Sequence, residues 1–344
     1  MLTFTLLESL PEVPLCCAFW DKTVFPDGAL PKSGFLDLNA ASKIPVWRLL
    51  KVMWAFEKKT TFLNTYDWIL FSGIYAPLAI HNHPTGANLL YCHTIPRFAY
   101  DLKEFYASLL PLPFRPAFYG LVLLMRNKYQ RALVHMDIII ANSNNVKKRL
   151  EKYLGRSAIV IHPPVNTDRF HWTGQKDYYL SLARLENFKR VDLIVNAFRR
   201  MPDKKLVVTS SGTEIKRLRR LAADAPNIRF TGWQTEEQLR QWIGDAIAAI
   251  YIPIDEDFGI SPVEAMSAGK PVIGTAEGGL LETIAPNKTG ILLDPPPTVD
   301  AIMAAVQDLT PERALKMRSA CEARAKLFTR DIFLEKMKAI IDCQ

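Results

Sequence analysis

Four charged residues in the second half of the chain have the types and spacing of a site for phosphate and hydroxyl groups. Arg184 and Lys189 stand five residues apart, where a predicted strand gives way to a helix. Both cations can converge on a diphosphate at the carboxyl end of that strand, Arg through a forked contact and Lys as a point charge. Glu256 and Glu264 bracket a similar junction at Gly259. Taken alone, each pair also fits a solvated surface loop.

The junction at Gly259 supplies further groups that such a site needs. Glycine lets the backbone approach a ligand closely, and the amides at a helix start favour oxygen atoms and negative charge. Glu264, one turn into the helix, offers two acceptors to adjacent hydroxyls such as those of a ribose, and Glu256 can face a sugar. The alternatives are an exposed acid for Glu256 and helix-dipole stabilisation, about 0.3–1 kcal/mol, for Glu264.

Two glycine-containing junctions follow other predicted strands. Gly278 and Gly279 can present further amides to sugar or phosphate, or they can form a simple tight turn in which Glu282 caps a helix. The Ser210-Ser211-Gly212 junction leaves room for a nucleotide and is the weaker signal of the two.

Short apolar runs alternate with helix-like segments along the whole chain, which is typical of β-α-β units and a parallel sheet. The predicted strands are 15–19, 68–72, 89–93, 138–142, 159–162, 178–183, 206–210, 228–231, 248–252, 271–274 and 290–293. The predicted helices are 46–62, 191–200, 214–223, 236–243, 262–268, 299–308 and 312–328. Prolines near residues 162–165 disfavour both helix and central strand and mark a break.

Length and composition fit two α/β domains of a globular protein. The 344 residues are 49% hydrophobic and 23% charged, near the averages for such proteins. We expect domains over 1–165 and 166–330. The five cysteines are odd in number and form no C-x-x-C, which argues against a disulfide framework or a zinc site and favours a reducing compartment such as the cytoplasm. The start has no basic n-region, and no apolar run approaches the ~18 residues that span a bilayer.

The positive charge of the chain is concentrated in its first half. Residues 1–165 carry a net charge of +7 and residues 166–344 a net charge of +1. Nucleic acid and anionic membrane are both candidate partners for a basic surface, but no nucleic-acid motif is recognisable, so we expect no nucleic-acid partner. The predicted helix 46–62, with Trp47 and Trp54 beside lysines, suits peripheral contact with an anionic membrane. An ordinary half-buried helix is the simpler alternative.

Three stretches of the second half resemble the signature of the retaining glycosyltransferases of family 4. They are LARLENFKRVD at 182–192, EDFGISPVEAMSAGKPVIGTAEGGLLETI at 256–284 and TGILLDP at 289–295. In the first half, YCHTIPRFAYD at 91–101 is similar to the Y-x-H-T-P-x-R-x-x-x-D stretch of bacterial polysaccharide mannosyltransferases. The resemblance implies the α/β GT-B architecture, two facing Rossmann-like domains with an interdomain cleft. It also implies that a final helix within 331–344 packs back on the first domain.

The resemblance also implies roles for individual residues. Arg184 and Lys189 would hold the donor diphosphate, Glu264 the ribose hydroxyls, and Glu256 the transferred hexose, while His93 would approach the sugar from the first domain. The catalytic set would be His93, Arg184, Lys189 and Glu256; the other donor-binding residues would be Gly212, Phe258, Gly259, Ile260, Glu264, Gly278 and Gly279. Arg97 and Asp101 would orient His93 or bind the acceptor, or they form a plain ion pair. Without the resemblance, His93 would be taken for a core or loop histidine.

One departure from the family pattern affects the start of the chain. Members normally begin with a strand, a glycine-rich loop and a helix, whereas MLTFTLLESLPEVPLCCAFW resembles only the end of that helix and the next strand. We therefore expect the first strand and the glycine-rich loop to be missing. A donor-binding pseudoenzyme or partner subunit is the alternative function that this departure suggests.

The function that the resemblance implies is retaining transfer of a hexose from a nucleotide sugar. UDP-glucose ranks narrowly ahead of GDP-mannose as the donor, and the acceptor would be a saccharide or polyprenyl-linked saccharide in polysaccharide biosynthesis, at the inner face of the membrane. Two cations on the diphosphate can replace a divalent metal, so we expect no metal and no cofactor besides the donor. A sugar-nucleotide epimerase of similar architecture is a second alternative.

Overall fold

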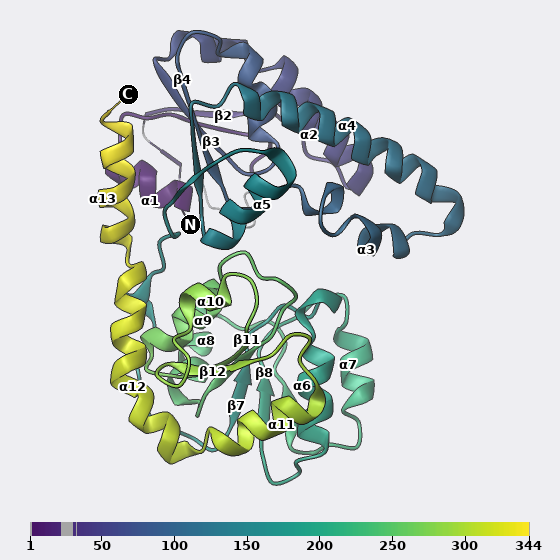
Figure 1. The fold of residues 1–344 in the computed structure, drawn as a ribbon, viewed down its shortest axis with the longest axis vertical. Coiled ribbons are helices and arrows are strands. Elements are labelled where there is room, and N and C mark those ends of the chain that lie inside the picture. Colours follow the sequence, from purple (N-terminus) through teal and green to yellow (C-terminus); the bar gives the residue numbers. More distant parts are fainter. Residues whose placement is uncertain (1, 22–29, 32, 344) are drawn as a thin grey trace. The chain divides into compact units, whose positions relative to one another are not determined.

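A computed structural model describes residues 2–21, 30–31 and 33–343 (Figure 1). It divides into two compact units, Met1–Pro163 with Leu334–Gln344 and Pro164–Phe333. Each unit is built on parallel strands with helical connections. No helix among the described residues combines the length and the apolarity needed to cross a bilayer.

The first unit contains a four-stranded parallel sheet and a separate parallel pair of strands. The sheet has the order β3-β4-β5-β6, and β1 pairs with β2. The strands are β1 (Leu15–Cys17), β2 (Phe35–Asp37), β3 (Trp68–Ser72), β4 (Ala87–Cys92), β5 (Ile138–Ala141) and β6 (Ile159–Val160). β4 lies inside the sheet and is buried over most of its length, as expected for a parallel strand covered on both faces.

The helices of the first unit begin and end at recognisable residues. Pro45 starts α2, and the Ser143 side chain accepts a hydrogen bond from the backbone N–H of Val146 at the start of α5. Gly155, in the left-handed conformation, ends α5, as is common at helix C-termini. The helices are α1 (Leu2–Ser9), α2 (Pro45–Lys58), α3 (Lys103–Ser108), α4 (Arg115–Val134) and α5 (Asn144–Leu154). The last helix, α13 (Arg330–Ile341), begins in the second unit and belongs to the first unit from Leu334 on.

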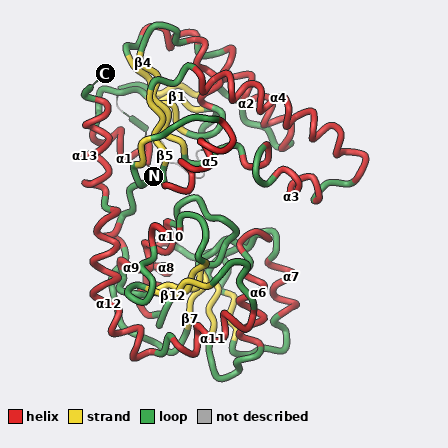
Figure 2. The backbone as a smooth tube through the Cα atoms, viewed as in Figure 1, coloured by secondary structure: helices red, strands yellow, loops and turns green. Residues whose placement is uncertain are grey.

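The second unit is a doubly wound sheet of six parallel strands. The strand order is β12-β11-β10-β7-β8-β9, and Figure 2 shows the strands lying between helices. The strands are β7 (Tyr179–Ser181), β8 (Leu206–Val208), β9 (Ile228–Phe230), β10 (Ala249–Tyr251), β11 (Val272–Thr275) and β12 (Gly290–Leu293). The order reverses between β7 and β10, and open α/β sheets bind ligands at the carboxyl ends of the strands beside such a reversal.

Three helices of the second unit, α8, α11 and α12, are capped by threonine side chains. Thr235 forms a capping box with Gln238, and the side chains of Thr298 and Thr310 accept from backbone amides of the helices that follow them, an arrangement worth about 1 kcal/mol per cap. The helices are α6 (Val191–Arg199), α7 (Ile215–Leu221), α8 (Glu236–Asp245), α9 (Ile260–Ser267), α10 (Leu280–Thr283), α11 (Val299–Asp308) and α12 (Pro311–Ala325).

Short 3-10 helices complete the connections. They are η2 (Thr61–Thr65), η3 (Ala76–Asn82), η4 (Arg97–Ala99), η5 (Leu112–Phe114), η6 (Thr167–Arg169), η7 (Asn187–Lys189) and η8 (Lys326–Phe328). The predicted helix 46–62 is too long at its end: α2 stops at Lys58, and the Thr60 hydroxyl donates to the Phe56 carbonyl. The predicted helix 312–328 likewise passes into η8 at Lys326.

Candidate functional site

The candidate site lies where the strand order of the second sheet reverses. The loop after β7 carries Arg184 and Lys189, and the loop after the neighbouring strand β10 carries Glu256. The backbone N–H of Ile254 donates to the carbonyl of Phe188 at 2.9 Å, which fixes one loop against the other. Ligands of open α/β sheets bind at this position.

Lys189, Glu256 and Tyr251 form a compact hydrogen-bonded cluster. The Lys189 Nζ lies 2.6 Å from Glu256 Oε2 and 3.2 Å from the Tyr251 hydroxyl, which itself donates to Glu256 Oε2 at 3.1 Å. The ammonium also lies over the Phe188 and Tyr251 rings. Since an ammonium has three N–H donors, one is left for an oxygen atom of a ligand.

The cluster is only slightly exposed to solvent, which strengthens the attraction between its charged groups. The Lys189 and Glu256 side chains are 14% and 17% exposed, so their attraction is screened less than that of a surface pair. Burial, with Glu256 alongside, raises the pKa of Tyr251 well above its usual value, so its hydroxyl stays protonated and donates. A fixed ammonium and a fixed carboxylate side by side can bind phosphate and sugar hydroxyl groups respectively.

The Gly278-Gly279 turn packs against the backbone around Glu256. A Cβ at Gly278 would lie 2.5 Å from the Glu256 carbonyl oxygen, and one at Gly279 would lie 2.4 Å from Phe258 Cα. The Gly279 N–H donates to the Glu256 carbonyl at 2.7 Å. This amide is thus engaged with protein, and the two glycines permit the close approach that holds Glu256 in place.

The start of α9 presents backbone amides beside this loop. Gly259 is the N-cap, at φ +94°, and no side chain caps the helix. In the first helical turn the amides lack partners within the helix, so those of Ile260 and Ser261 are available to an anionic ligand. Phe258 is buried and packs edge-on against Phe328 at 5.3 Å between ring centroids. This packing anchors the approach to the helix.

Glu264 is a largely buried carboxyl one turn into α9. Burial raises its pKa to about 7, and the charge of Arg169 on η6 partly offsets this effect. Its side chain makes no hydrogen bond with any residue that the structure describes. At neutral pH the carboxyl therefore lies between its neutral and ionised forms, and hydroxyl donors from a ligand would favour ionisation.

Arg184 and Gly212 lie in the loops after β7 and β8. Arg184 is exposed, and its side chain makes no ion pair with the described part of the chain. The neighbouring Leu185 N–H donates to the Ser211 carbonyl, and a Cβ at Gly212 would lie 2.4 Å from the Leu185 carbonyl oxygen. Gly212 thus allows the β7 and β8 loops to approach each other.

Sequence reasoning missed three features of this site. Tyr251 is at the end of a buried strand, where a tyrosine looks like core. Arg190 pairs with Glu277 at 2.5 Å and joins the β7 and β11 loops; their positions beside Lys189 and Gly278 were the available signal. Asp255 and Asp257 also flank Glu256 in a D-x-D triplet. Among the described residues, no three His, Cys, Asp or Glu side chains gather as a metal site.

His93 belongs to the first unit and follows β4. Its Nε2 is 3.0 Å from the Ser72 hydroxyl, and its carbonyl accepts from the Asn142 side chain at 2.8 Å. Burial lowers the pKa of His93 to about 4, so the ring is neutral at physiological pH. Arg97 and Asp101 form an ion pair at 2.7 Å. The roles of these three residues toward sugar or acceptor stay predictions.

Comparisons with known proteins identify the second half of the chain. Residues 164–328 match the family model described as glycosyl transferases group 1. The alpha-1,3/1,6-mannosyltransferase ALG2 of Dictyostelium discoideum is 29% identical over 207 residues, 46% of this chain and 49% of the relative. The GDP-mannose-dependent alpha-(1-6)-phosphatidylinositol monomannoside mannosyltransferase of Mycolicibacterium smegmatis is 31% identical over 214 residues, 53% of this chain and 55% of the relative. The chain thus spans about half the length of these relatives.

Solved structures show the same fold. Sucrose-phosphate synthase of Thermosynechococcus elongatus has a TM-score of 0.75 at 19% identity and covers 90% of this chain and 82% of its own. HepE of Anabaena, solved with UDP and glucose, has a TM-score of 0.73 at 15% identity, covering 99% and 95%. At such identities the likeness concerns the fold alone, which is the α/β GT-B class. The family match shows that residues 164–328, just under half of the chain, form a glycosyl transferases group 1 domain.

Proposed function

We propose that the chain is a retaining hexosyltransferase that moves a hexose from a nucleoside diphosphate sugar to a hydroxyl group of a saccharide or lipid-linked saccharide. The observation that carries the proposal is the Lys189–Glu256–Tyr251 cluster at the strand-order reversal, next to the free amides of α9. In this proposal residues 166–330 bind the donor, and residues 1–165, with a final helix in 331–344, take the acceptor.

The proposed reaction breaks the bond between the anomeric carbon and the diphosphate oxygen. Lys189, Arg184 and the α9 amides stabilise the negative charge that develops on the diphosphate. Glu256 and the backbone of Gly259 position the hexose, and Glu264 accepts from the ribose hydroxyls. The acceptor oxygen forms the new bond on the same face, and its proton passes to the departing phosphate. A covalent sugar trapped on Glu256 would contradict this mechanism.

The comparisons change the order of the two candidate donors. The sequence alone narrowly favours UDP-glucose, but relatives at about 30% identity are mannosyltransferases, and one is named for its dependence on GDP-mannose. We therefore propose GDP-mannose as the donor, with UDP-glucose second. The polysaccharide pathway and the polyprenyl-linked acceptor stay proposals drawn from the sequence.

A panel of nucleotide sugars tests the proposal. The protein is heated with each donor, and a ligand present at 100 times its dissociation constant should add about 2.7 kcal/mol of stability. Turnover with the best donor and a lipid-linked saccharide follows. Stabilisation with product supports a transferase, and stabilisation without product supports the pseudoenzyme alternative. Conversion of the nucleotide sugar in the absence of acceptor supports the epimerase.

Glu264 predicts a pH-dependent affinity for the donor nucleotide. Because its pKa is raised to about 7 in the free protein, the carboxyl is mostly neutral at pH 6 and mostly ionised at pH 8. Ribose hydroxyls donate to the ionised form, so the dissociation constant for GDP should fall about tenfold between pH 6 and pH 8. Calorimetric titration with GDP, in the wild type and in Glu264→Gln, measures how the dissociation constant changes with pH in each protein. In the variant, the dissociation constant should keep only the pH dependence that comes from the diphosphate itself. An equal pH dependence in both proteins would show that Glu264 does not bind the ribose.

The first unit carries a surface that suits peripheral contact with an anionic membrane. On α2, Trp47 and Trp54 are 57% and 55% exposed, and the Lys59 ammonium lies 5.6 Å from the centre of the Trp54 ring. Amphipathic tryptophan beside lysine is typical of helices at a bilayer surface. We propose that this helix contacts the inner face of the membrane.

Vesicle binding tests the membrane proposal. Vesicles with anionic lipid should shift tryptophan emission to shorter wavelength and sediment the protein, whereas neutral vesicles should do so about tenfold less well. The double variant Trp47→Ser/Trp54→Ser should lose the binding with an unchanged circular dichroism spectrum. Equal sedimentation of this variant would place the contact elsewhere.

A further inference from the structure

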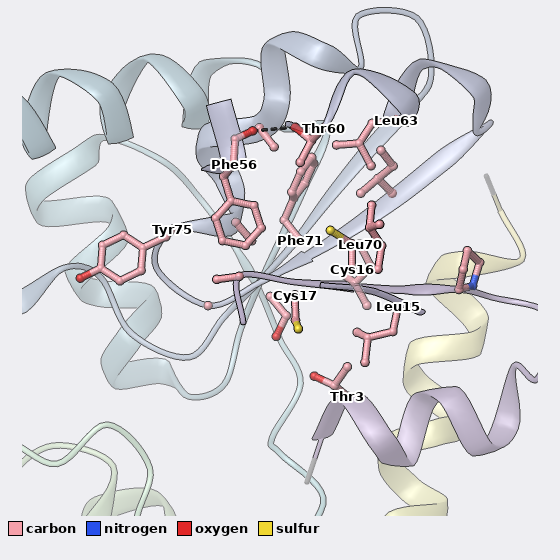
Figure 3. A pocket seen from close by; sticks show the side chains of 18 of the residues that line it. Thr3, Leu15, Cys16, Cys17, Phe56, Thr60, Leu63, Leu70, Phe71 and Tyr75 are labelled. Atoms are coloured by element: carbon pink, nitrogen blue, oxygen red, sulfur yellow. Dashed lines mark hydrogen bonds between the residues drawn. The ribbon is translucent and has the colours of Figure 1, made fainter. Parts of the chain in front are cut away.

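Two cysteines and one ion pair outside the cluster of Lys189 are candidates for further chemistry. Cys16 and Cys17 of β1 line a cavity of about 1100 Å³ in the first unit, beside apolar side chains of β3 (Figure 3). Burial raises the pKa of the Cys16 thiol to about 12 and that of the Cys17 thiol to about 11. Both thiols are therefore protonated at physiological pH and are poor nucleophiles. The ion pair is Arg190 with Glu277, in the loops of the candidate site.

Arg190 has a backbone conformation that arginine rarely adopts. Its φ is +53°, in the left-handed region. The other non-glycine residues with positive φ in the described part of the chain are Asn39, Asp255 and Asn287, and asparagine and aspartate tolerate this conformation. For arginine it costs free energy, and residues held in this way gather at functional sites, where the surrounding structure fixes them.

Hydrogen bonds on both sides of Arg190 fix its backbone. Its N–H donates to the Asn187 carbonyl at 3.1 Å, and its carbonyl accepts from the Leu193 N–H at 3.2 Å. Arg190 thus lies between η7 and α6 and is the N-cap of α6. At this point the side chains of two consecutive cations go to different loops. Lys189 reaches the loop after β10, and Arg190 reaches the loop after β11.

The Arg190–Glu277 ion pair is short and only slightly exposed. Arg190 Nη1 lies 2.5 Å from Glu277 Oε1, and the two side chains are 15% and 19% exposed. Charges at this depth are screened less than those of a surface pair. Among the residues that the structure describes, this is the only hydrogen bond or ion pair between the loop after β7 and the loop after β11. Removing either partner therefore leaves these two loops without a direct polar connection.

The ion pair completes a closed ring of three loops around the Lys189 ammonium. Lys189 pairs with the Glu256 side chain at 2.6 Å, and the Gly279 N–H donates to the Glu256 carbonyl at 2.7 Å. Glu277, two residues before Gly279, pairs with Arg190, which follows Lys189 directly. Each loop is thus held from two sides. An ammonium fixed in this way before the substrate arrives is what electrostatic stabilisation of a transition state requires.

We propose that Arg190 and Glu277 are a positioning pair for hexose transfer, which holds the Lys189 ammonium where negative charge develops on the departing diphosphate. Neither residue touches the reacting atoms; both act through Lys189 and Glu256. The proposal rests on the proposed function, because it gives the pair a part in that reaction. The alternative role is an ion pair that stabilises the fold and has no effect on transfer.

Two single variants and their combination test the positioning role. Arg190→Gly removes the pair and also relieves the left-handed backbone, whereas Glu277→Gln removes one charge and leaves the backbone unchanged. Each should lower kcat for hexose transfer about tenfold and change the KM for the donor less than about twofold. The double variant should also lose about tenfold, because the two residues act as a unit, whereas independent roles would multiply to about a hundredfold.

Asp224→Asn is the matched control for Glu277→Gln. Asp224 pairs with Arg199 at 2.8 Å on the surface of the same unit, where the two side chains are 69% and 35% exposed. The change from acid to amide is the same, but this pair lies outside the ring of loops. The variant should keep kcat within about twofold of the wild type.

Hydrogen exchange reads the positions of the loops without any turnover. The Gly279 N–H donates to the Glu256 carbonyl and the Ile254 N–H to the Phe188 carbonyl, so each of these amides joins two loops of the ring. In Arg190→Gly and in Glu277→Gln, both amides should exchange about tenfold faster than in the wild type. The Leu206 amide in β8 is the internal reference and should not change.

The results separate the positioning role from the transfer reaction itself. If the wild type transfers no hexose from any nucleotide sugar, the proposed function fails and the positioning role falls with it. If the wild type transfers hexose and both single variants keep its kcat, only the positioning role is overturned. A hundredfold loss in the double variant would also overturn it, and so would unchanged exchange at Gly279 and Ile254, since the loops would then be held without the ion pair.

Discussion

Lys189→Ala is expected to lower the turnover number for hexose transfer by about 100- to 1000-fold, which corresponds to roughly 3–4 kcal/mol of transition-state stabilisation. The ammonium is held by Glu256 and Tyr251, at 2.6 and 3.2 Å, so it does not have to reorganise when negative charge develops on the diphosphate. Steady-state kinetics with saturating donor and acceptor measures the loss. Because the interaction strengthens in the transition state, kcat should fall more than KM rises.

Lys205→Ala is the matched control for this experiment. Lys205 is 62% exposed and pairs with Asp177 on the surface of the same unit, so its loss should leave turnover within about twofold of the wild type. Glu256→Ala should be about as damaging as Lys189→Ala, and the double variant should lose far less than the product of the two losses, since the residues act as a unit. Wild-type turnover in either single variant, with the fold intact by circular dichroism, would refute the site assignment.

Most strands of the second sheet, and β4 and β5 of the first, could be predicted from the sequence because most of their residues are buried and apolar. The run Ala248–Ile252 is apolar throughout and became β10, and 68–72 and 290–293 match β3 and β12 at both ends. Most other strands are shorter than predicted, since apolar residues continue into the loops that leave the sheet. The prediction for 159–162 shrinks to two residues because the chain leaves the sheet ahead of Pro163.

Elements whose apolar residues do not recur at the spacing of a strand or an amphipathic helix were not predicted. β2, with only Phe35–Asp37, has no apolar alternation long enough to indicate a strand, and its pairing with β1 is a non-local contact. α4 carries apolar residues on most of its surface, and several of them, such as Leu123, are exposed. Such a helix lacks the amphipathic pattern from which helices are predicted.

The charged residues of the candidate site could be predicted from the sequence, but the contacts that hold them in place could not. The charge of Lys189 and Glu256 and their positions after strands predict that they share a site, and the fold brings them into contact. The support given by Tyr251 depends on where a strand ends, to within one residue, which is the least reliable part of a sequence prediction. For Gly278 and Gly279 the sequence allowed either ligand-binding amides or a turn. Deciding between these two roles requires the position of the Glu256 loop, whose backbone lies against both glycines.

Gly278→Ala is expected to lower the free energy of unfolding by about 2–4 kcal/mol and to weaken donor binding as well. The residue has φ +63°, and a Cβ there would lie 2.5 Å from the Glu256 carbonyl oxygen and 2.7 Å from its nitrogen. Both atoms are backbone, so relief requires the Glu256 loop to move. Its carboxylate would then leave Lys189, and the two effects should appear together in denaturant unfolding and in GDP titration.

Gly232→Ala separates the backbone strain from the contact with Glu256. Gly232 has φ +73°, but a Cβ there would meet nothing within 4 Å. Alanine at this position should therefore cost only the left-handed conformation, about 1–2 kcal/mol, and leave GDP affinity unchanged. The additional destabilisation in Gly278→Ala then measures how firmly the two loops are held against each other. If both variants lost the same stability and bound GDP equally well, the glycine turn would have no part in positioning Glu256, and the rigid support that we assign to the site would have to come from the Lys189 and Tyr251 contacts alone.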